Sequence, residues 1–408
     1  MPVITVFSGT FCNDEPVLQA LLQSTKYKLV TDADLIGEAS RLSSIPEPKI
    51  DRAFSAHTSV FNKITHERER SIAFLRLALA RMQSDDNRIF SGFAGQLIAR
   101  DLSHVLRVCL IADMKSRIAT AASLLQVSEQ EASRLIRKQD EDRAVWIQTG
   151  KGNNDPWDAS LYDMVFPTDK VTDEAIAGTV AEIVETTVVR RTDRSKKAIQ
   201  DFLLAAEVEV ALIQEGHQVT VQAKGGDVTL TINKHVLMLS RLENELKSIA
   251  GKVPGVRSVT TRVGAGFHQV DIYRRQDFSM PSKILLVDDE REFVQTLSER
   301  LLMRDLGSAV AYDGESALEV VREDEPDVMI LDLKMPGIDG IEVLRRVKAT
   351  QPEIEVIILT GHGSEADKET CMQLGAFAYL QKPVDVEELS ATIKSANEKI
   401  QQTRAAVK

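Results

Sequence analysis

Short apolar runs alternate with amphipathic stretches over the last third of the chain. Residues 284–287, 328–331 and 356–359 are wholly apolar, which is typical of strands buried on both faces of a sheet. Apolar residues at helical spacing lie between them, as over 292–304 and 316–322. This alternation predicts a doubly wound parallel sheet in a domain over residues 282–402.

The two upstream regions have different patterns. Residues 217–224 and 227–233 are β-like and are joined by Gly225-Gly226, a pair suited to a tight hairpin because both glycines can take positive φ. A helical stretch precedes them, another follows over 236–251, and a further β-run comes after Pro254-Gly255. Together these elements predict a small α+β module of order α-β-β-α-β over 190–275. Residues 3–7 predict a strand that leads through a loop to a helix, within an α/β domain over 1–185.

Composition and charge narrow the classes of protein. The chain has 408 residues and a net charge of −11. Residues 281–408 contain 15 Lys and Arg against 25 Asp and Glu, so the acidity belongs to the C-terminal third. A nucleic-acid partner is therefore not expected, because non-specific binding needs a basic face. No apolar run is long enough to span a membrane, and three distant cysteines do not form a disulfide framework, so we expect a cytoplasmic protein without a membrane partner.

Polar side chains follow the predicted strands of the C-terminal domain. Asp288 and Asp289 come after the first strand, Asp332 after 328–331, Thr360 after 356–359, and Lys382 after 378–380. Ligands bind at the carboxyl ends of strands in such sheets. Clustered carboxylates suit Mg²⁺, and one of them can then accept a phosphoryl group whose charge the lysine neutralises. Strand-end aspartates can also cap helices, but capping explains neither the lysine nor the doubled aspartate.

The stretches 284–290, 327–337, 357–361 and 375–383 resemble the receiver domain of two-component response regulators. The resemblance implies a five-stranded, flavodoxin-like sheet and a sensor histidine kinase as partner. It also implies that Asp332 is the phosphoacceptor and that Asp288, Asp289 and Asp332 bind Mg²⁺ together with the carbonyl of Lys334. Thr360 and Tyr379 would then be the switch pair, and Lys382 the phosphate-binding lysine.

The N-terminal region resembles the cytidylate-kinase-like branch of nucleoside monophosphate kinases over 126–132, 137–143, 155–157 and 162–165. Its loop over 8–16 has no lysine, and Asp14 and Glu15 stand where a phosphate would bind. Phe93 stands where a substrate-binding arginine is expected. We therefore expect a P-loop-kinase-like fold without ATP-dependent catalysis, and leave open whether the protein is an enzyme. The arginines that remain are either anion ligands or a solvated helix face: Arg117, Arg134, Arg137 and Arg143.

Two further patterns affect the predicted output. The middle module is similar to the BON domain over about 193–272, which favours a protein-interaction or spacer role and leaves open a homodimer through the hairpin edge. Residues 118–136 have the look of a helix-turn-helix, but the second helix would begin with Glu129, Gln130 and Glu131, whose two carboxylates have the wrong sign for phosphates.

The favoured function is thus a phosphorelay response regulator whose output is a protein–protein contact of the upstream domains, with the downstream partner unknown. The first alternative is a receiver-regulated nucleoside monophosphate (cytidylate) kinase. The second is a DNA-binding transcriptional regulator.

Overall fold

The structure is a computed structural model that describes residues 2–83, 87–100, 102–186, 189, 191–236, 238–268, 283–304, 306–361 and 363–406. The predicted linker 274–282 lies outside these residues. The chain forms two compact units: unit 1 contains 1–58 and 68–274, and unit 2 contains Ser59–Glu67 and 275–408. Within the described part of the chain, no helix combines the length and the apolar character needed to cross a membrane.

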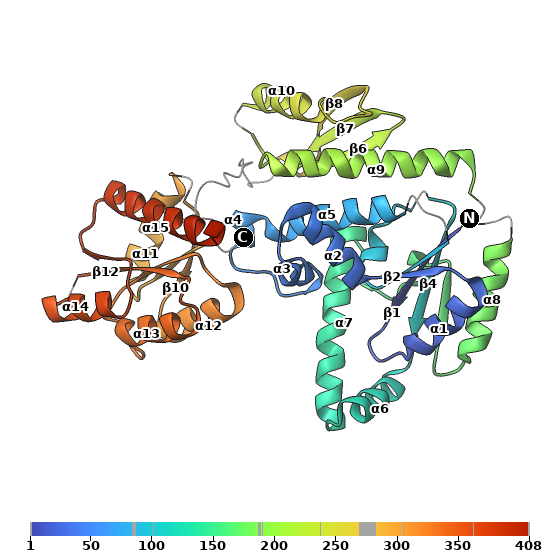
Figure 1. The fold of residues 1–408 in the computed structure, drawn as a ribbon, viewed down its shortest axis with the longest axis horizontal. Coiled ribbons are helices and arrows are strands. Elements are labelled where there is room, and N and C mark those ends of the chain that lie inside the picture. The colour runs from blue at the N-terminus through green and yellow to red at the C-terminus, as the bar shows by residue number, and fades with distance from the viewer. Residues whose placement is uncertain are drawn as a thin grey trace. The chain divides into compact units, whose positions relative to one another are not determined.

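Unit 1 begins with a five-stranded parallel sheet of order β2-β3-β1-β4-β5 (Figure 1). Its strands are β1 (Val3–Ser8), β2 (Lys28–Thr31), β3 (Arg88–Ser91), β4 (Val105–Ile111) and β5 (Met164–Pro167). Its helices are α1 (Asp14–Thr25), α2 (Asp32–Ser43), α3 (Glu47–Asp51), α5 (Glu67–Met82, whose first residue belongs to unit 2), α6 (Met114–Leu125), α7 (Glu129–Lys151) and α8 (Asp173–Glu185), with short 3₁₀ turns η1 (Arg52–Phe54), η2 (Ala94–Leu97) and η3 (Ala159–Leu161).

This sheet buries both faces, as a parallel sheet requires. One face packs with α5 around Phe7, Phe74 and Phe90, and the other packs with α1 and α8 around Ile4, Leu21 and Val180. Helices α6 and α7 form a hairpin (Figure 1). Asp113 and Ser128 cap the two helices with their side chains, so local capping sets where each begins.

The middle module has the predicted order α-β-β-α-β: α9 (Asp193–Gln214), β6 (Thr220–Lys224), β7 (Asp227–Ile232), α10 (Leu239–Ala250) and β8 (Ser258–Val263), followed by η4 (Ala265–His268). Strands β6 and β7 are antiparallel, and Gly225 and Gly226 take positive φ between them. Helix α9 serves two cores, since Val208 packs on the module's own sheet while Ala206 packs in the core shared with α5. The module therefore belongs to unit 1. Dimerisation through the edge strand β6 stays a prediction.

Unit 2 contains the predicted five-stranded parallel sheet, in the flavodoxin-like order β10-β9-β11-β12-β13. Its strands are β9 (Ile284–Val287), β10 (Ser308–Ala311), β11 (Val328–Leu331), β12 (Glu355–Thr360) and β13 (Ala378–Gln381). Its helices are α11 (Arg291–Leu302), α12 (Gly314–Asp324), α13 (Gly340–Thr350), α14 (Glu365–Gln373), α15 (Val386–Ala406) and the short α4 (Asn62–Thr65) from the earlier segment. One layer of helices packs around Leu285 and Val343, the other around Leu286 and Leu389.

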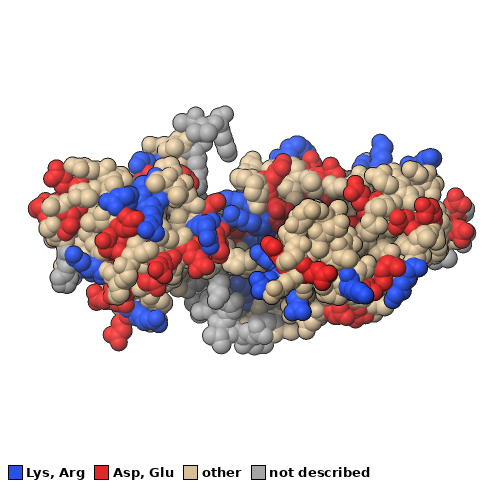
Figure 2. All heavy atoms as spheres, turned by 90° about the horizontal axis from the view of Figure 1, so that it is seen from below, with Lys and Arg blue, Asp and Glu red and all other residues tan. Residues whose placement is uncertain are grey.

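Charge is spread over the surface in both signs. On the face shown in Figure 2, Lys and Arg side chains are interspersed with Asp and Glu among the described residues. That face offers no continuous basic surface of the kind that duplex binding uses.

Candidate functional site

The predicted site residues of unit 2 lie at one edge of its sheet. Strands β9 and β11 are neighbours with Val287 beside Leu331, so Asp288 and Asp332 leave adjacent strands side by side. The main-chain N–H of Asp332 donates to Val287, and that of Lys382 donates to Thr360, each at 2.9 Å. The chain reverses its direction of strand addition between β9 and β11, and ligands bind at such a switch point.

Asp288, Asp289 and Asp332 form an acidic group. One carboxylate oxygen from each lies within 4.8 Å of the others, with Asp288 and Asp332 buried and Asp289 exposed. Asp332 Oδ1 is buried and accepts no hydrogen bond among the described residues. Three carboxylates with a free buried oxygen fit a hard divalent cation such as Mg²⁺, which prefers oxygen ligands and keeps several waters. Lys334 follows in the loop after β11, and its predicted carbonyl ligand stays a prediction.

Lys382 lies across this acidic group. Its Nζ is 2.5 Å from Asp288 Oδ2, 3.5 Å from Glu290 Oε1 and 4.0 Å from Asp332 Oδ1. The ammonium therefore neutralises part of the negative charge that the aspartates bring together.

The pKa values of this pair reflect opposing effects. Burial raises the pKa of Asp288 above its usual value, against the hydrogen bond from Lys382, which lowers it. Burial alone would lower the pKa of Lys382, but the hydrogen bond to Asp288 and the carboxylate charges raise it. Lys382 is therefore a permanent cation at neutral pH.

Thr360 and Tyr379 lie on neighbouring strands close to Gly363. A Cβ placed on Gly363 would be 1.6 Å from the Tyr379 hydroxyl and 3.1 Å from the Thr360 methyl. The loop after β12 thus passes directly over both side chains, and any side chain at residue 363 would displace the Tyr379 hydroxyl. Burial raises the pKa of Tyr379, so its hydroxyl stays protonated.

The sequence places Glu290 directly after the first strand, beside Asp288 and Asp289, so a carboxylate here was expected. It gave no sign of a second partner of Lys382, Phe293. The Lys382 ammonium lies 4.4 Å from the centre of the Phe293 ring, within cation–π range. The signal was weak because Phe293, in the first turn of α11, reads as an ordinary core position.

Replacing Lys382 with Met should tighten Mg²⁺ binding, because the lysine competes with the cation for the Asp288 carboxylate. We expect affinity to rise about 3- to 10-fold at neutral pH. Calorimetric titration with MgCl₂ measures the change. Lys399→Met is the matched control, since Lys399 pairs with Glu355 Oε1 at 2.7 Å, at the amino end of β12. Unchanged or weaker affinity in Lys382→Met would contradict the competition.

The N-terminal loop after β1 is closed by its own side chains. The Ser8 hydroxyl donates to Asp14 at 2.8 Å, and Phe11 and Asn13 take positive φ. Asp14 and Glu15 occupy the first turn of α1. Carboxylates at this position favour the helix but repel a phosphate.

Arg117 and Arg143 support this loop. Arg117 is buried, forms a bidentate pair with Asp140 at 2.6 and 2.9 Å, and donates to the Thr10 carbonyl. Arg143 donates to the Ser8 carbonyl at 2.7 Å and lies over the Phe93 ring. The hydrogen bonds of both guanidinium groups are therefore made to other parts of the protein.

The other two candidate arginines lie elsewhere. Arg134 and Arg137 are exposed on α7, and Arg134 lines a pocket together with Glu131 and Lys138. Anion binding by the four arginines stays a prediction. To bind an anion, Arg117 and Arg143 would have to give up the hydrogen bonds described above.

Asp32 was not noted in the sequence, yet it fills the loop after β3. Its carboxylate accepts the main-chain N–H groups of Phe93 at 2.7 Å and Ala94 at 2.9 Å. Burial raises its pKa to about 6. The main-chain amides of Phe93 and Ala94 thus hold an internal carboxylate.

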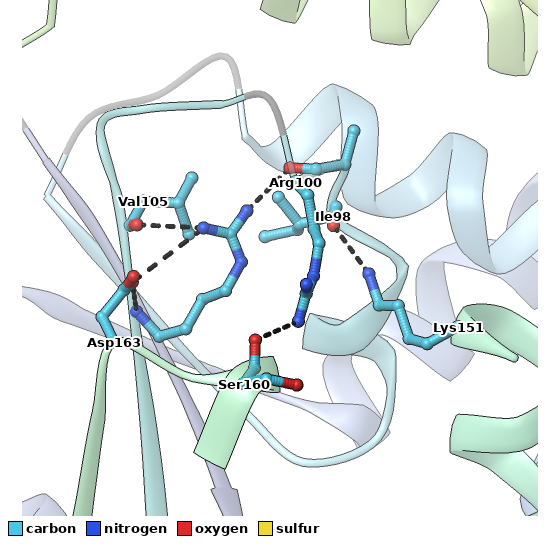
Figure 3. Close-up of polar contacts among 8 residues, drawn as sticks. Ile98, Arg100, Val105, Lys151, Ser160 and Asp163 are labelled. Carbon is cyan, nitrogen blue, oxygen red and sulfur yellow. Dashed lines mark hydrogen bonds and ion pairs between the residues drawn. The ribbon is translucent and has the colours of Figure 1, made fainter. Parts of the chain in front are cut away.

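A pocket of about 600 Å³ is lined by the end of α7 and the residues after it, together with Arg100, Ser160 and Leu161. Figure 3 shows Arg100 donating to the Ser160 carbonyl and Lys151 donating to the Ile98 carbonyl. Arg107 forms an ion pair with Asp163. Burial, together with Arg107, Arg100 and Arg76, lowers the pKa of Lys151 to about 8.

Lys151→Met should stabilise unit 1 at neutral pH. The folded pKa of about 8 lies below the unfolded value of about 10.5, so folded protein binds fewer protons between them. Burying the charged ammonium lowers the unfolding free energy by its full amount below pH 8. This loss shrinks as the pH rises towards 10.5, because the folded protein then holds Lys151 uncharged. We expect a gain of about 1–2 kcal/mol at pH 7 that shrinks by pH 9.5.

Urea unfolding followed by tryptophan fluorescence measures this gain. The chain has two tryptophans, Trp146 and Trp157, and both lie in unit 1. Lys138→Met, an exposed change on the same helix, should leave the unfolding free energy within about 0.5 kcal/mol. A gain equal at pH 7 and 9.5 would argue against a charge effect.

Two family models match the chain. Residues 284–394 match the response regulator receiver domain, and residues 3–170 match the cytidylate kinase-like family. The resemblance of the middle module to the BON domain stays a prediction.

Among known proteins, the response regulator MprA of Mycolicibacterium vanbaalenii is 35% identical over 116 residues, which is 28% of this chain and 50% of MprA. The chain thus spans about half the length of this curated relative. A receiver domain from Clostridium thermocellum is 36% identical, covers 30% of this chain and 98% of its own, and has a TM-score of 0.28. The NtrX receiver of Brucella abortus is 28% identical, over 28% of this chain and 98% of its own, with a TM-score of 0.27.

The family matches agree with the geometry of unit 2, where an acidic group and a lysine meet at the carboxyl edge of a flavodoxin-like sheet. The C-terminal part of this chain is a response regulator receiver domain, and it follows a region that matches the cytidylate kinase-like family.

Proposed function

We propose that the protein is a phosphorelay response regulator in which Asp332 accepts a phosphoryl group from a sensor histidine kinase. The observation that carries this proposal is the buried Asp332 Oδ1, which accepts no hydrogen bond among the described residues and lies within reach of two further aspartates and Lys382. A carboxylate oxygen kept free in such a place is available as a nucleophile.

In the proposed reaction, an Asp332 oxygen attacks phosphorus, the P–N bond of a phosphohistidine breaks, and the imidazole leaves with the bond's electron pair. Asp288, Asp289, Asp332 and the Lys334 carbonyl would hold Mg²⁺, which neutralises charge on the phosphoryl oxygens. Lys382 releases its contact with Asp288 and binds a phosphoryl oxygen. The Thr360 hydroxyl then donates to the phosphoryl group, and Tyr379 moves with the loop over it.

We infer that the output is a protein contact of the upstream regions rather than nucleotide transfer. The loop after β1 has no lysine, and Arg117 and Arg143 donate to the Thr10 and Ser8 carbonyls. The Asp32 carboxylate already accepts from the amides after β3. The exposed acidic start of α7, with Glu129 and Glu131, does not favour duplex binding. A cytoplasmic location suits the buried free thiols Cys12, Cys109 and Cys371.

Incubation of the full chain with phosphoramidate tests the phosphoacceptor function. We expect one phosphoryl group per chain, seen as a mass increase in intact-protein mass spectrometry and lost on treatment with hydroxylamine, as for an acyl phosphate. EDTA should reduce the labelling rate by about 100-fold, because the aspartates then repel the incoming anion. Labelling that is independent of Mg²⁺ or stable to hydroxylamine would overturn the proposal.

A further inference from the structure

A short segment of the N-terminal region belongs to the receiver's compact unit. Residues Ser59–Glu67 are flanked in the sequence by parts of unit 1, yet they pack in unit 2 with residues 275–408. The segment, which we call the clip, contains α4 and supplies the first residue of α5. The receiver therefore contains a piece of chain from outside its own 120-residue region.

The clip contributes a side chain to the receiver's core. Phe61 is fully buried and belongs to the same apolar cluster as Leu285, Ala317 and Val321. A buried aromatic ring is a large apolar contact, so removal of the clip would leave a cavity beside α12.

Polar contacts accompany this insertion. The Val60 main-chain N–H donates to Asp324 Oδ2 at 3.2 Å. The buried Lys283 ammonium lies 2.9 Å from Glu67 Oε2 and donates to the Asp324 carbonyl at 3.2 Å. The clip thus supplies a partner to one buried carboxylate and to one buried ammonium, and either charge would be costly to bury alone.

The surface that receives the clip is shaped for it at Gly307. A Cβ at this position would lie 2.4 Å from Ile64 Cγ2. Any larger residue would displace Ile64, so the glycine permits the close approach.

The clip site and the acidic site lie at opposite ends of the same elements. Lys283 precedes β9, and Asp288 follows it. Asp324 ends α12, whose start is capped by Asp313. Strand β9 and helix α12 therefore connect the acidic edge to residues that hold the clip.

The clip continues into α5, which reaches the core of unit 1. Glu67 begins this helix, and Phe74 and Leu75 are buried in the unit 1 core. We propose that Ser59–Glu67 is an intramolecular output contact, through which the phosphorylation state of the receiver alters the anchoring of α5 in the kinase-like region. This inference rests on the proposed phosphoacceptor function.

Hydrogen exchange of the full chain, read by mass spectrometry, tests the proposal. The probe is beryllofluoride with Mg²⁺, chosen because a BeF₃ group on a carboxylate oxygen has the tetrahedral shape and the charge of a phosphoryl group. We expect beryllofluoride to protect peptides around Asp332 and to change exchange in Ser59–Glu67 and the first turn of α5 by about 3-fold or more.

Two variants and a control separate docking from signalling. Phe61→Ala should speed exchange of the clip about 10-fold and remove its response to beryllofluoride, while Val60→Ala, an exposed neighbour, should leave both within about 2-fold. Glu67→Gln, which keeps the shape and the core intact, should speed exchange at the start of α5 by about 3-fold, which covers the case in which Phe61→Ala does not fold.

The other possible results would overturn either this inference alone or the phosphoacceptor function as well. Protection around Asp332 with an unchanged clip would overturn this inference and leave the phosphoacceptor function standing. No protection around Asp332 would overturn both. Equal exchange of the clip in wild type, Phe61→Ala and Glu67→Gln would show that the clip is not docked and would overturn the inference.

Discussion

Replacing Asp332 with Asn should abolish labelling of the full chain by phosphoramidate. The amide has no carboxylate oxygen to attack phosphorus, and its NH₂ group cannot serve as a metal ligand. We expect less than about 1% of the wild-type labelling rate, a loss of at least about 2.7 kcal/mol in transition-state stabilisation. Intact-mass measurements over a time course give the rate.

Asp339→Asn is the matched control for this change. Asp339 lies in the same loop region, and its Oδ1 accepts the Glu342 N–H at 2.8 Å as the cap of α13. Asn caps helices about as well as Asp, so this variant should fold and label like wild type. Wild-type labelling of Asp332→Asn would place the acceptor elsewhere, and peptide mapping of the labelled chain would show whether Asp288 or Asp289 had taken its place.

Replacing Gly340 with Ala should severely destabilise the receiver. Gly340 begins α13 directly against the loop that carries Asp332. A Cβ there would lie 2.1 Å from the Asp332 carbonyl oxygen and 2.8 Å from the Leu333 Cα. Both are main-chain atoms of a buried loop and cannot move cheaply, so we expect a loss of roughly 2–4 kcal/mol in unfolding free energy.

Pulsed hydrogen exchange across a urea series measures this loss on receiver peptides. Gly361→Ala is the control, because a Cβ at Gly361 meets only the Lys382 stem, at an ordinary 3.9 Å. It should change the unfolding free energy by less than about 1 kcal/mol. A Gly340→Ala receiver as stable as the control would show that the loop after β11 can move away from α13.

Much of the receiver could be predicted from the sequence because its signals are local. The runs 284–287 and 328–331 coincide with β9 and β11, and 356–359 lies inside β12. Strands buried on both faces must be apolar throughout, and the polar residue that ends each run marks the edge of the sheet. The acidic group could be predicted for the same reason, since parallel strands bring their carboxyl ends to one edge.

The remaining features depend on contacts between residues far apart in the sequence. In the sequence, Phe293 looks like an ordinary core residue and Asp32 like an ordinary capping residue. Only the folded chain shows that Phe293 contacts the Lys382 ammonium and that Asp32 accepts from the amides after β3. The sharing of α9 between two cores likewise has no signature in its helical periodicity. Amphipathic spacing shows that a face is buried and does not show what buries it.

The sequence by itself determined a chain of acidic and near-neutral parts, a doubly wound C-terminal sheet, and the carboxylates and lysine at its edge. Only the tertiary structure decided which partners these charges have and where Ser59–Glu67 packs. The physical reason is that the apolar pattern of a strand and the polar residues at its end are local features, which span only a few consecutive residues. A buried ammonium such as Lys283 instead takes its counter-charge from Glu67, more than 200 residues away in the sequence.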